Sequence, residues 1–242
     1  MKDSNALKKG QEAMHAKIYQ HAQELGLIKQ KPCLEPMCDG VADIQGYLST
    51  SPKIMWILKE PWGEYTPSGK IRGGGWSFTD HFLDNEVWKD EAMWKVIIQI
   101  NHAIHKNVNW GELDYIDGNQ EMIDELKRTA YINLSKMPAE TSSSPNHLEQ
   151  CYPIWKDIVF EQIDLYEPDV IIFGYTFPYF RDDLQISDEP IHTESNKWFT
   201  DTYRKNNMIL VDAYHPSRKG GEDGSEEYVT SVVNAVRKAM SK

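Results

Sequence analysis

The chain has 242 residues, enough for one large domain with a sizeable core, and 40% of them are hydrophobic, which excludes a disordered protein. Its 26 Lys and Arg residues against 37 Asp and Glu residues give a net charge of −11, which excludes broad, non-specific attraction to a phosphate backbone. No apolar run approaches the roughly 20 residues that cross a bilayer, so we expect no membrane segment.

Residues 1–50 are expected to form an N-terminal helical extension that packs on the core of one globular domain, residues 51–242. Apolar side chains recur at helical spacing between residues 6 and 25, and Gly26 supplies a stop. The N-terminus lacks the apolar segment of a signal peptide, and three cysteines (Cys33, Cys38 and Cys151) are too few for a disulfide framework. We therefore expect a cytoplasmic protein with reduced thiols, no metal and no cofactor.

Four short apolar runs predict a three-layer αβα sandwich with a central, mainly parallel, four-stranded sheet. The runs span residues 53–58, 130–134, 169–173 and 208–213. Helices are predicted at residues 88–105, 120–127, 145–166 and 228–240. The alternation of strands and helices implies right-handed crossovers between parallel strands.

Each apolar run stops at chemically capable residues. Glu60 follows the first run, Asn133 ends the second, and His215 and Ser217 follow the last. Because the carboxyl ends of parallel strands share one edge of the sheet, these residues are predicted to line one pocket. The glycine-rich residues 63–75 are predicted to form a mobile loop beside it.

Glu60 and His215 are the candidate catalytic residues. A carboxylate at Glu60 can polarise a water or stabilise a developing positive charge, or it can cap a turn or pair with Lys59 or Arg72. Pro216 favours an extended backbone at His215, whose imidazole can then donate a hydrogen bond to an oxygen that gains charge. A purely structural histidine is the alternative.

Asn133 offers one acceptor and two donors in a plane, which suits the edge of a pyrimidine or an amide, or the capping of a turn. Phe78 is either a core residue or a stacking platform for a planar ring. Ser217 can hold a phosphate through its hydroxyl or backbone N–H. Basic residues near the proposed edge can contact phosphates or form a solvated rim: Lys59, Lys70, Arg72, Lys136, Arg218 and Lys219.

Taken together, these motifs resemble the uracil-DNA glycosylase superfamily over residues 54–219. Residues 58–63 resemble the family's first motif, and residues 75–78 resemble the segment whose phenylalanine stacks on the flipped base. Asn133 falls where the family places a uracil-reading asparagine. Residues 215–217 resemble the second motif, whose histidine stabilises the departing uracil anion, and residues 149–174 are similar to the family's iron–sulfur branch.

The resemblance implies hydrolysis of the N-glycosidic bond of uracil or a related damaged base in DNA, through an oxocarbenium-like sugar. The roles that it implies are catalysis by Glu60 and His215, base binding by Asn133, Phe78 and Trp62, and phosphate or DNA binding by Lys136, Ser217, Arg218, Lys219 and Arg72. The implied partner is single-stranded or damaged DNA, or a ligand that contains a nucleobase.

Three departures from the family pattern affect this expectation. Glu60 is one methylene longer than the family's aspartate, and Met137 stands where the iron–sulfur branch places a cluster cysteine, so we expect no iron–sulfur cluster. Residues 218–221 carry no bulky apolar wedge for opening a duplex, which favours single-stranded, damaged or non-DNA substrates. A non-catalytic nucleobase or nucleoside binder and a small-molecule hydrolase on the same fold are the alternatives.

Overall fold

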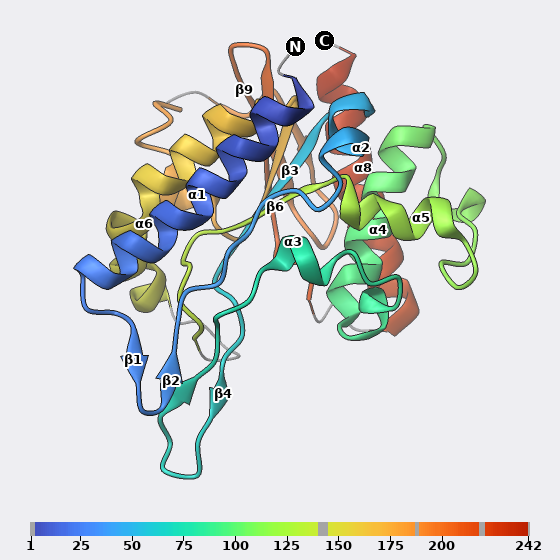
Figure 1. Ribbon diagram of the computed structural model, residues 1–242. Helices are drawn as coiled ribbons and strands as arrows, with labels where there is room; N and C mark the ends of the chain where they lie inside the picture. Colours follow the sequence, from blue (N-terminus) through green and yellow to red (C-terminus); the bar gives the residue numbers. More distant parts are fainter. Residues whose placement is uncertain (1–2, 140–144, 187–188, 218–220, 242) are drawn as a thin grey trace.

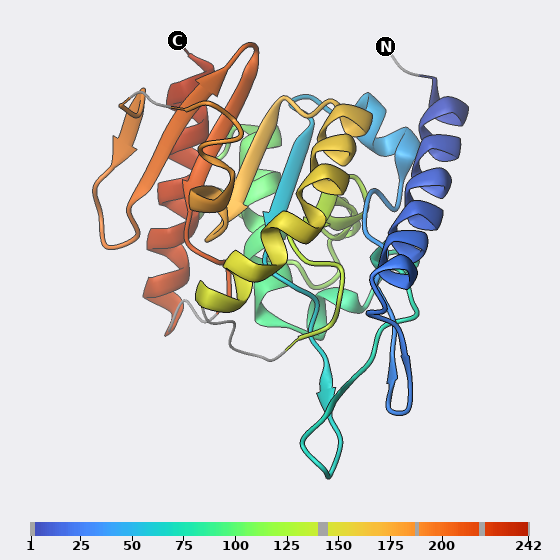
Figure 2. The same ribbon diagram turned by 90° about the vertical axis from the view of Figure 1, so that its left-hand side faces the viewer.

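The computed structural model describes residues 3–139, 145–186, 189–217 and 221–241, and these form a six-stranded, mostly parallel sheet between two layers of helices (Figures 1 and 2). The three-layer α/β sandwich predicted from the sequence is confirmed. In spatial order the strands are β6 (Ala130–Asn133), β3 (Ile54–Leu58), β7 (Val170–Gly174), β10 (Met208–Ala213), β9 (Thr200–Lys205) and β8 (His192–Glu194).

The four predicted strands are the parallel part of the sheet, and the predicted strand count of four is wrong. Strands β9 and β8 add an antiparallel edge beside β10. Strand β3 and strand β7 are buried at every position because helices cover both of their faces. Strand β9 instead mixes buried and exposed positions and includes Asp201 and Arg204, so it lacks the continuous apolar run that marks a central strand.

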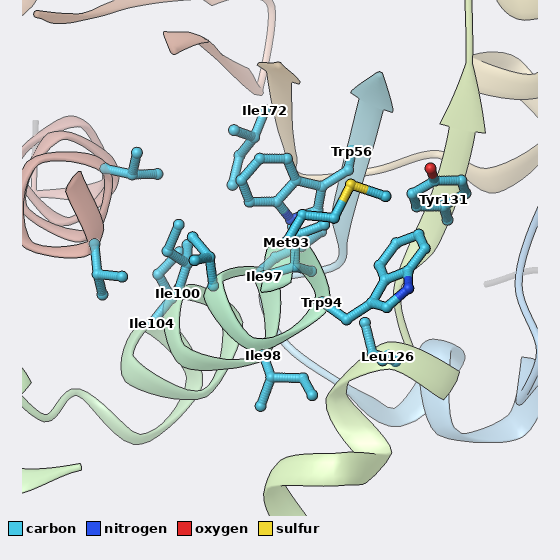
Figure 3. Close-up of a cluster of buried hydrophobic side chains, with 14 of the residues drawn as sticks. Trp56, Met93, Trp94, Ile97, Ile98, Ile100, Ile104, Leu126, Tyr131 and Ile172 are labelled. Atoms are coloured by element: carbon cyan, nitrogen blue, oxygen red, sulfur yellow. The ribbon is translucent and has the colours of Figure 1, made fainter. Parts of the chain in front are cut away.

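Two hydrophobic clusters cover the faces of the sheet. In the first, Trp56 and Ile172 pack against Met93, Trp94 and Ile97 (Figure 3). The helices of this face are α4 (Ala92–Lys106), α5 (Gln120–Lys127) and α8 (Gly221–Met240). The helices of the other face are α1 (Ser4–Glu24), α6 (Pro145–Tyr166) and α7 (Phe177–Phe180). No helix in the described ranges is long and apolar enough to cross a membrane.

The glycine-rich segment is a hairpin rather than an irregular loop. Its strands, β4 (Glu64–Tyr65) and β5 (Ile71–Arg72), pair antiparallel. Backbone hydrogen bonds through Gly73 join it to a second hairpin, formed by β1 (Lys29–Gln30) and β2 (Cys33–Leu34). Both hairpins project from the end of the molecule where the parallel strands end (Figure 2). Gly74 has φ of 84°, and a Cβ there would lie 1.8 Å from the Glu35 carbonyl oxygen, so this junction requires glycine.

A fully buried ion pair ties the N-terminal segment to the sheet. The Lys136 ammonium donates to both Asp39 carboxylate oxygens, at 2.7 and 3.0 Å, to the Asn133 carbonyl at 2.7 Å and to Gln162 Oε1 at 2.8 Å. Asp39 also accepts from Gln162 Nε2 and from the Asn133 N–H, both at 2.7 Å. Both charged groups are therefore hydrogen-bonded by other protein groups.

Replacing the buried lysine should cost far more stability than replacing an exposed one. Lys136→Met leaves the Asp39 carboxylate buried without its counter-charge, and we expect the free energy of unfolding to fall by about 3–5 kcal/mol in urea denaturation. Lys17→Met is the control, because Lys17 pairs with Glu161 at the half-exposed surface and its loss costs about 0–1 kcal/mol. Equal losses in the two variants would contradict this account of the buried pair.

Candidate active site at the strand ends

A cleft of about 960 Å³ lies at the carboxyl edge of the parallel strands. At least one residue from the end of each parallel strand lines it, including Glu60 after β3, Asn133 at the end of β6, Tyr175 after β7 and His215 after β10. The pairing of Leu58 with Asn133 places the ends of β3 and β6 side by side. Trp62, Phe78 and Ser217 also line the cleft.

Asn133 presents a buried amide to the cleft. Asn133 is 1% exposed. Its backbone N–H donates to Asp39 and its carbonyl accepts from Lys136, and these two hydrogen bonds fix its backbone. Within the described part of the chain, neither Oδ1 nor Nδ2 makes a hydrogen bond of normal geometry, and the amide interacts only weakly with the Tyr131 hydroxyl. An unsatisfied buried polar group costs about 1–3 kcal/mol, so this amide is poised for a ligand that supplies a donor and an acceptor.

Phe78 is both a core residue and a wall of the cleft. It begins the short helix α3 (Phe78–His81), which Ser77 caps by accepting from the Thr79 N–H at 3.1 Å. The Phe78 ring lies 4.7 Å from the ring of Trp76 and 4.8 Å from that of Tyr131. Only 5% of the residue is exposed, so the surrounding rings fix the orientation of the Phe78 ring.

The imidazole of His215 is held in one tautomer. Its Nδ1 lies 2.8 Å from Ser217 Oγ and 3.3 Å from the Ser217 backbone nitrogen. A backbone N–H can only donate, so Nδ1 acts as the acceptor and the proton of the neutral ring is on Nε2. Ser217 thus orients His215, and in the neutral ring the Nε2–H group is the donor.

The cleft also contains residues that the sequence did not single out. Tyr131 also lines the cleft, and burial, reinforced by the carboxylates of Glu91 and Asp39 and weakly opposed by the Asn133 side chain, raises the pKa of its hydroxyl well above the usual value. Burial also raises the pKa of Glu91, with Asp90 adding to the shift and His81 opposing it. Asp90 and Glu91 directly precede α4, and only the folded chain brings the start of this helix to the strand ends.

Several predicted phosphate-binding residues do not gather at the cleft. Lys136 is 0% exposed and bound to Asp39, so the prediction that it contacts phosphate is wrong. Arg72 is on the projecting hairpin, where it pairs with Glu64 at 2.8 Å. Arg218 and Lys219 lie outside the described residues. In those that are described, no group of three or more His, Cys, Asp or Glu residues is arranged to hold a metal ion.

A smaller hollow of about 300 Å³ adjoins the cleft. Tyr175 and Tyr214 line both spaces and form the wall between them. Phe199, Asp201 and Asp212 line the far side of the hollow. Burial raises the pKa of Asp212 to about 7, with Asp201 adding to the shift and Arg181 opposing it.

Two buried asparagines should respond oppositely to the same substitution. We expect Asn133→Leu to leave the free energy of unfolding unchanged or to raise it by about 1 kcal/mol, because it removes an amide that makes no hydrogen bond of normal geometry. Asn101→Leu should lower it by about 1–3 kcal/mol, because the Asn101 amide binds Trp56 Nε1 and Thr129 Oγ1. Urea denaturation of both variants tests this, and a large loss in Asn133→Leu would show that the amide is structural.

No protein-family model matches the chain, and a search of curated proteins found no match either. The chemistry of the cleft therefore has to be argued from its own residues. A carboxylate, an oriented imidazole and a buried amide face one space that is walled by aromatic rings.

Proposed function

We propose that this protein hydrolyses the N-glycosidic bond of uracil, or of a related damaged base, in single-stranded DNA. The observation that carries the proposal is the Asn133 amide, which is buried at the cleft and makes no hydrogen bond of normal geometry in the described residues. The resemblance of residues 54–219 to the uracil-DNA glycosylase superfamily supports the same reaction.

The amide matches one edge of uracil. Asn133 Oδ1 would accept from the N3–H of the base, and Nδ2 would donate to the neighbouring O4. The Phe78 ring would stack on the face of the base, with Tyr131 beside the same amide. Such a base has to leave its partner strand first, because a paired base already uses this edge.

Glu60 and His215 would have different roles in the hydrolysis. Water attacks C1′ of the sugar, the bond from C1′ to N1 breaks, and its electron pair leaves with the base. Glu60 would accept a proton from the attacking water and stabilise the positive charge that develops on the sugar. The Nε2–H group of His215 would donate to the oxygen of the base that gains negative charge.

The charges around the cleft favour a single strand or a smaller substrate over a duplex. Among the described lining residues, Glu60, Asp90 and Glu91 are acidic, whereas Lys59 is the one lysine. Most of the predicted basic residues that the structure describes lie elsewhere, as Lys136 and Arg72 show. A cleft of this kind suits an unpaired base with few phosphate contacts.

The first test is release of uracil from labelled single-stranded and duplex oligonucleotides at low salt. We expect abasic sites to form, faster in the single strand, and we expect Glu60→Gln and His215→Asn each to lower the rate by about 10²–10³. Glu64→Gln is the matched control, because Glu64 has the same side chain but pairs with Arg72 on the hairpin.

The same assay separates the alternatives. A folded wild type that yields no abasic site but binds uracil through Asn133 would replace hydrolysis with the non-catalytic nucleobase binder. Release of uracil from nucleosides but not from oligonucleotides would favour the small-molecule hydrolase. Equal rates in Glu60→Gln, Glu64→Gln and wild type would remove Glu60 from the reaction.

A further inference from the structure

Exposed aromatic side chains are concentrated around the cleft and the adjoining hollow. In the described part of the chain the large aromatic residues with substantial exposure are Trp62, Tyr65, Trp76, Tyr115, Tyr175, Phe199 and Tyr214. All but Tyr65 and Tyr115 line one or both of these spaces. Exposed aromatic surface gathered in one place typically marks a binding site, and flat rings suit a planar ligand.

The wall between the two spaces is fixed in place. The rings of Tyr175 and Tyr214 are stacked, with centroids 6.1 Å apart and planes 29° from parallel. Tyr175 has φ of 66°, a conformation that a bulky residue adopts only when its surroundings enforce it. Its N–H donates to the Ala213 carbonyl at 2.7 Å, which holds it against the end of β10.

The hollow beyond this wall combines aromatic surface with two carboxylates. Phe199 is 59% exposed at its rim, and Asp201 and Asp212 are directly opposite each other on the antiparallel strands β9 and β10. Above the Asp212 pKa of about 7, where both acids are ionised, they repel a phosphate and accept hydrogen bonds from an amine. The hollow therefore suits a flat ring that carries an exocyclic amine, which describes adenine, cytosine and guanine but not uracil or thymine.

We propose that this hollow is a subsite for a second base that carries an exocyclic amine (adenine, cytosine or guanine), next to the base held in the cleft. The assignment rests on the proposed function, because it requires a nucleobase in the cleft. Lys59 lies at the boundary between the cleft and the hollow. It lines the cleft, and its ammonium is 4.7 Å from the centroid of the Tyr175 ring. There it can neutralise the phosphate that links the two bases.

Binding of dinucleotides to the slowed variant Glu60→Gln tests the subsite at one fixed, low salt concentration. Deoxyuridine linked to deoxyadenosine is compared with deoxyuridine linked to an abasic sugar, in both chain orders, so that the two ligands have the same phosphates. We expect calorimetry to show about ten-fold tighter binding with the second base in one order, the size of effect that one stacked base produces. Adenine and cytosine should bind more tightly than thymine there.

Two variants test whether the tighter binding depends on the hollow. Phe199→Ala in the Glu60→Gln background should bring the affinity ratio between the two dinucleotides close to one, whereas Tyr115→Ala in the same background should keep it at about ten. Tyr115 is the control because it is 91% exposed and lines neither space. Equal affinities for the two dinucleotides in both orders, or no binding of either, would overturn the subsite.

The outcome for the subsite is separable from that for hydrolysis. Ten-fold tighter binding that Phe199→Ala abolishes supports the subsite even where the wild type releases no uracil, and in that case only the proposed reaction fails. Uracil release with equal affinities for the two dinucleotides would leave the reaction standing and overturn the second base site.

Discussion

The buried pair between Asp39 and Lys136 is the constraint on which the candidate site depends. It joins the segment after the first hairpin, the end of β6 and helix α6, whose Gln162 binds both partners. Gly40 and Tyr131 exchange two backbone hydrogen bonds of 2.9 Å beside it, so this segment also covers the outer edge of β6. Because Asp39 and Lys136 bind the N–H and carbonyl of Asn133, the pair sets the position of the amide in the cleft.

The rest of the site follows from the parallel sheet. Parallel strands end at one edge, and in this chain those ends carry an acid, an amide and an imidazole, each on a rigid element. The ring of Phe78 belongs to the core that supports the sheet, and this packing fixes its position relative to the Asn133 amide. Stability and the proposed function are most directly opposed at Asn133, where a buried amide is kept without a hydrogen bond of normal geometry in the described residues.

Local patterns predicted the parallel half of the fold, and contacts between distant residues decided the remainder. The continuous apolar runs of β3 and β7 reflect burial on both faces, so the sequence alone predicted these strands. It also predicted that Glu60 and His215 follow strand ends. Lys136 looked like a surface cation because its partner, Asp39, lies 97 residues earlier in the chain. The half-exposed strand β9 and the positive φ of Tyr175 have no comparable local signal.

The most direct test of the account is NMR of the side-chain amide of Asn133, labelled with ¹⁵N and assigned by its absence in Asn133→Leu. The account predicts that uracil shifts this amide signal, together with signals from Phe78, and that the Asn101 amide, which is already hydrogen-bonded, stays in place. Uracil that binds without moving the Asn133 signal, or that fails to bind at millimolar concentration, would contradict the claim that this buried amide reads a base.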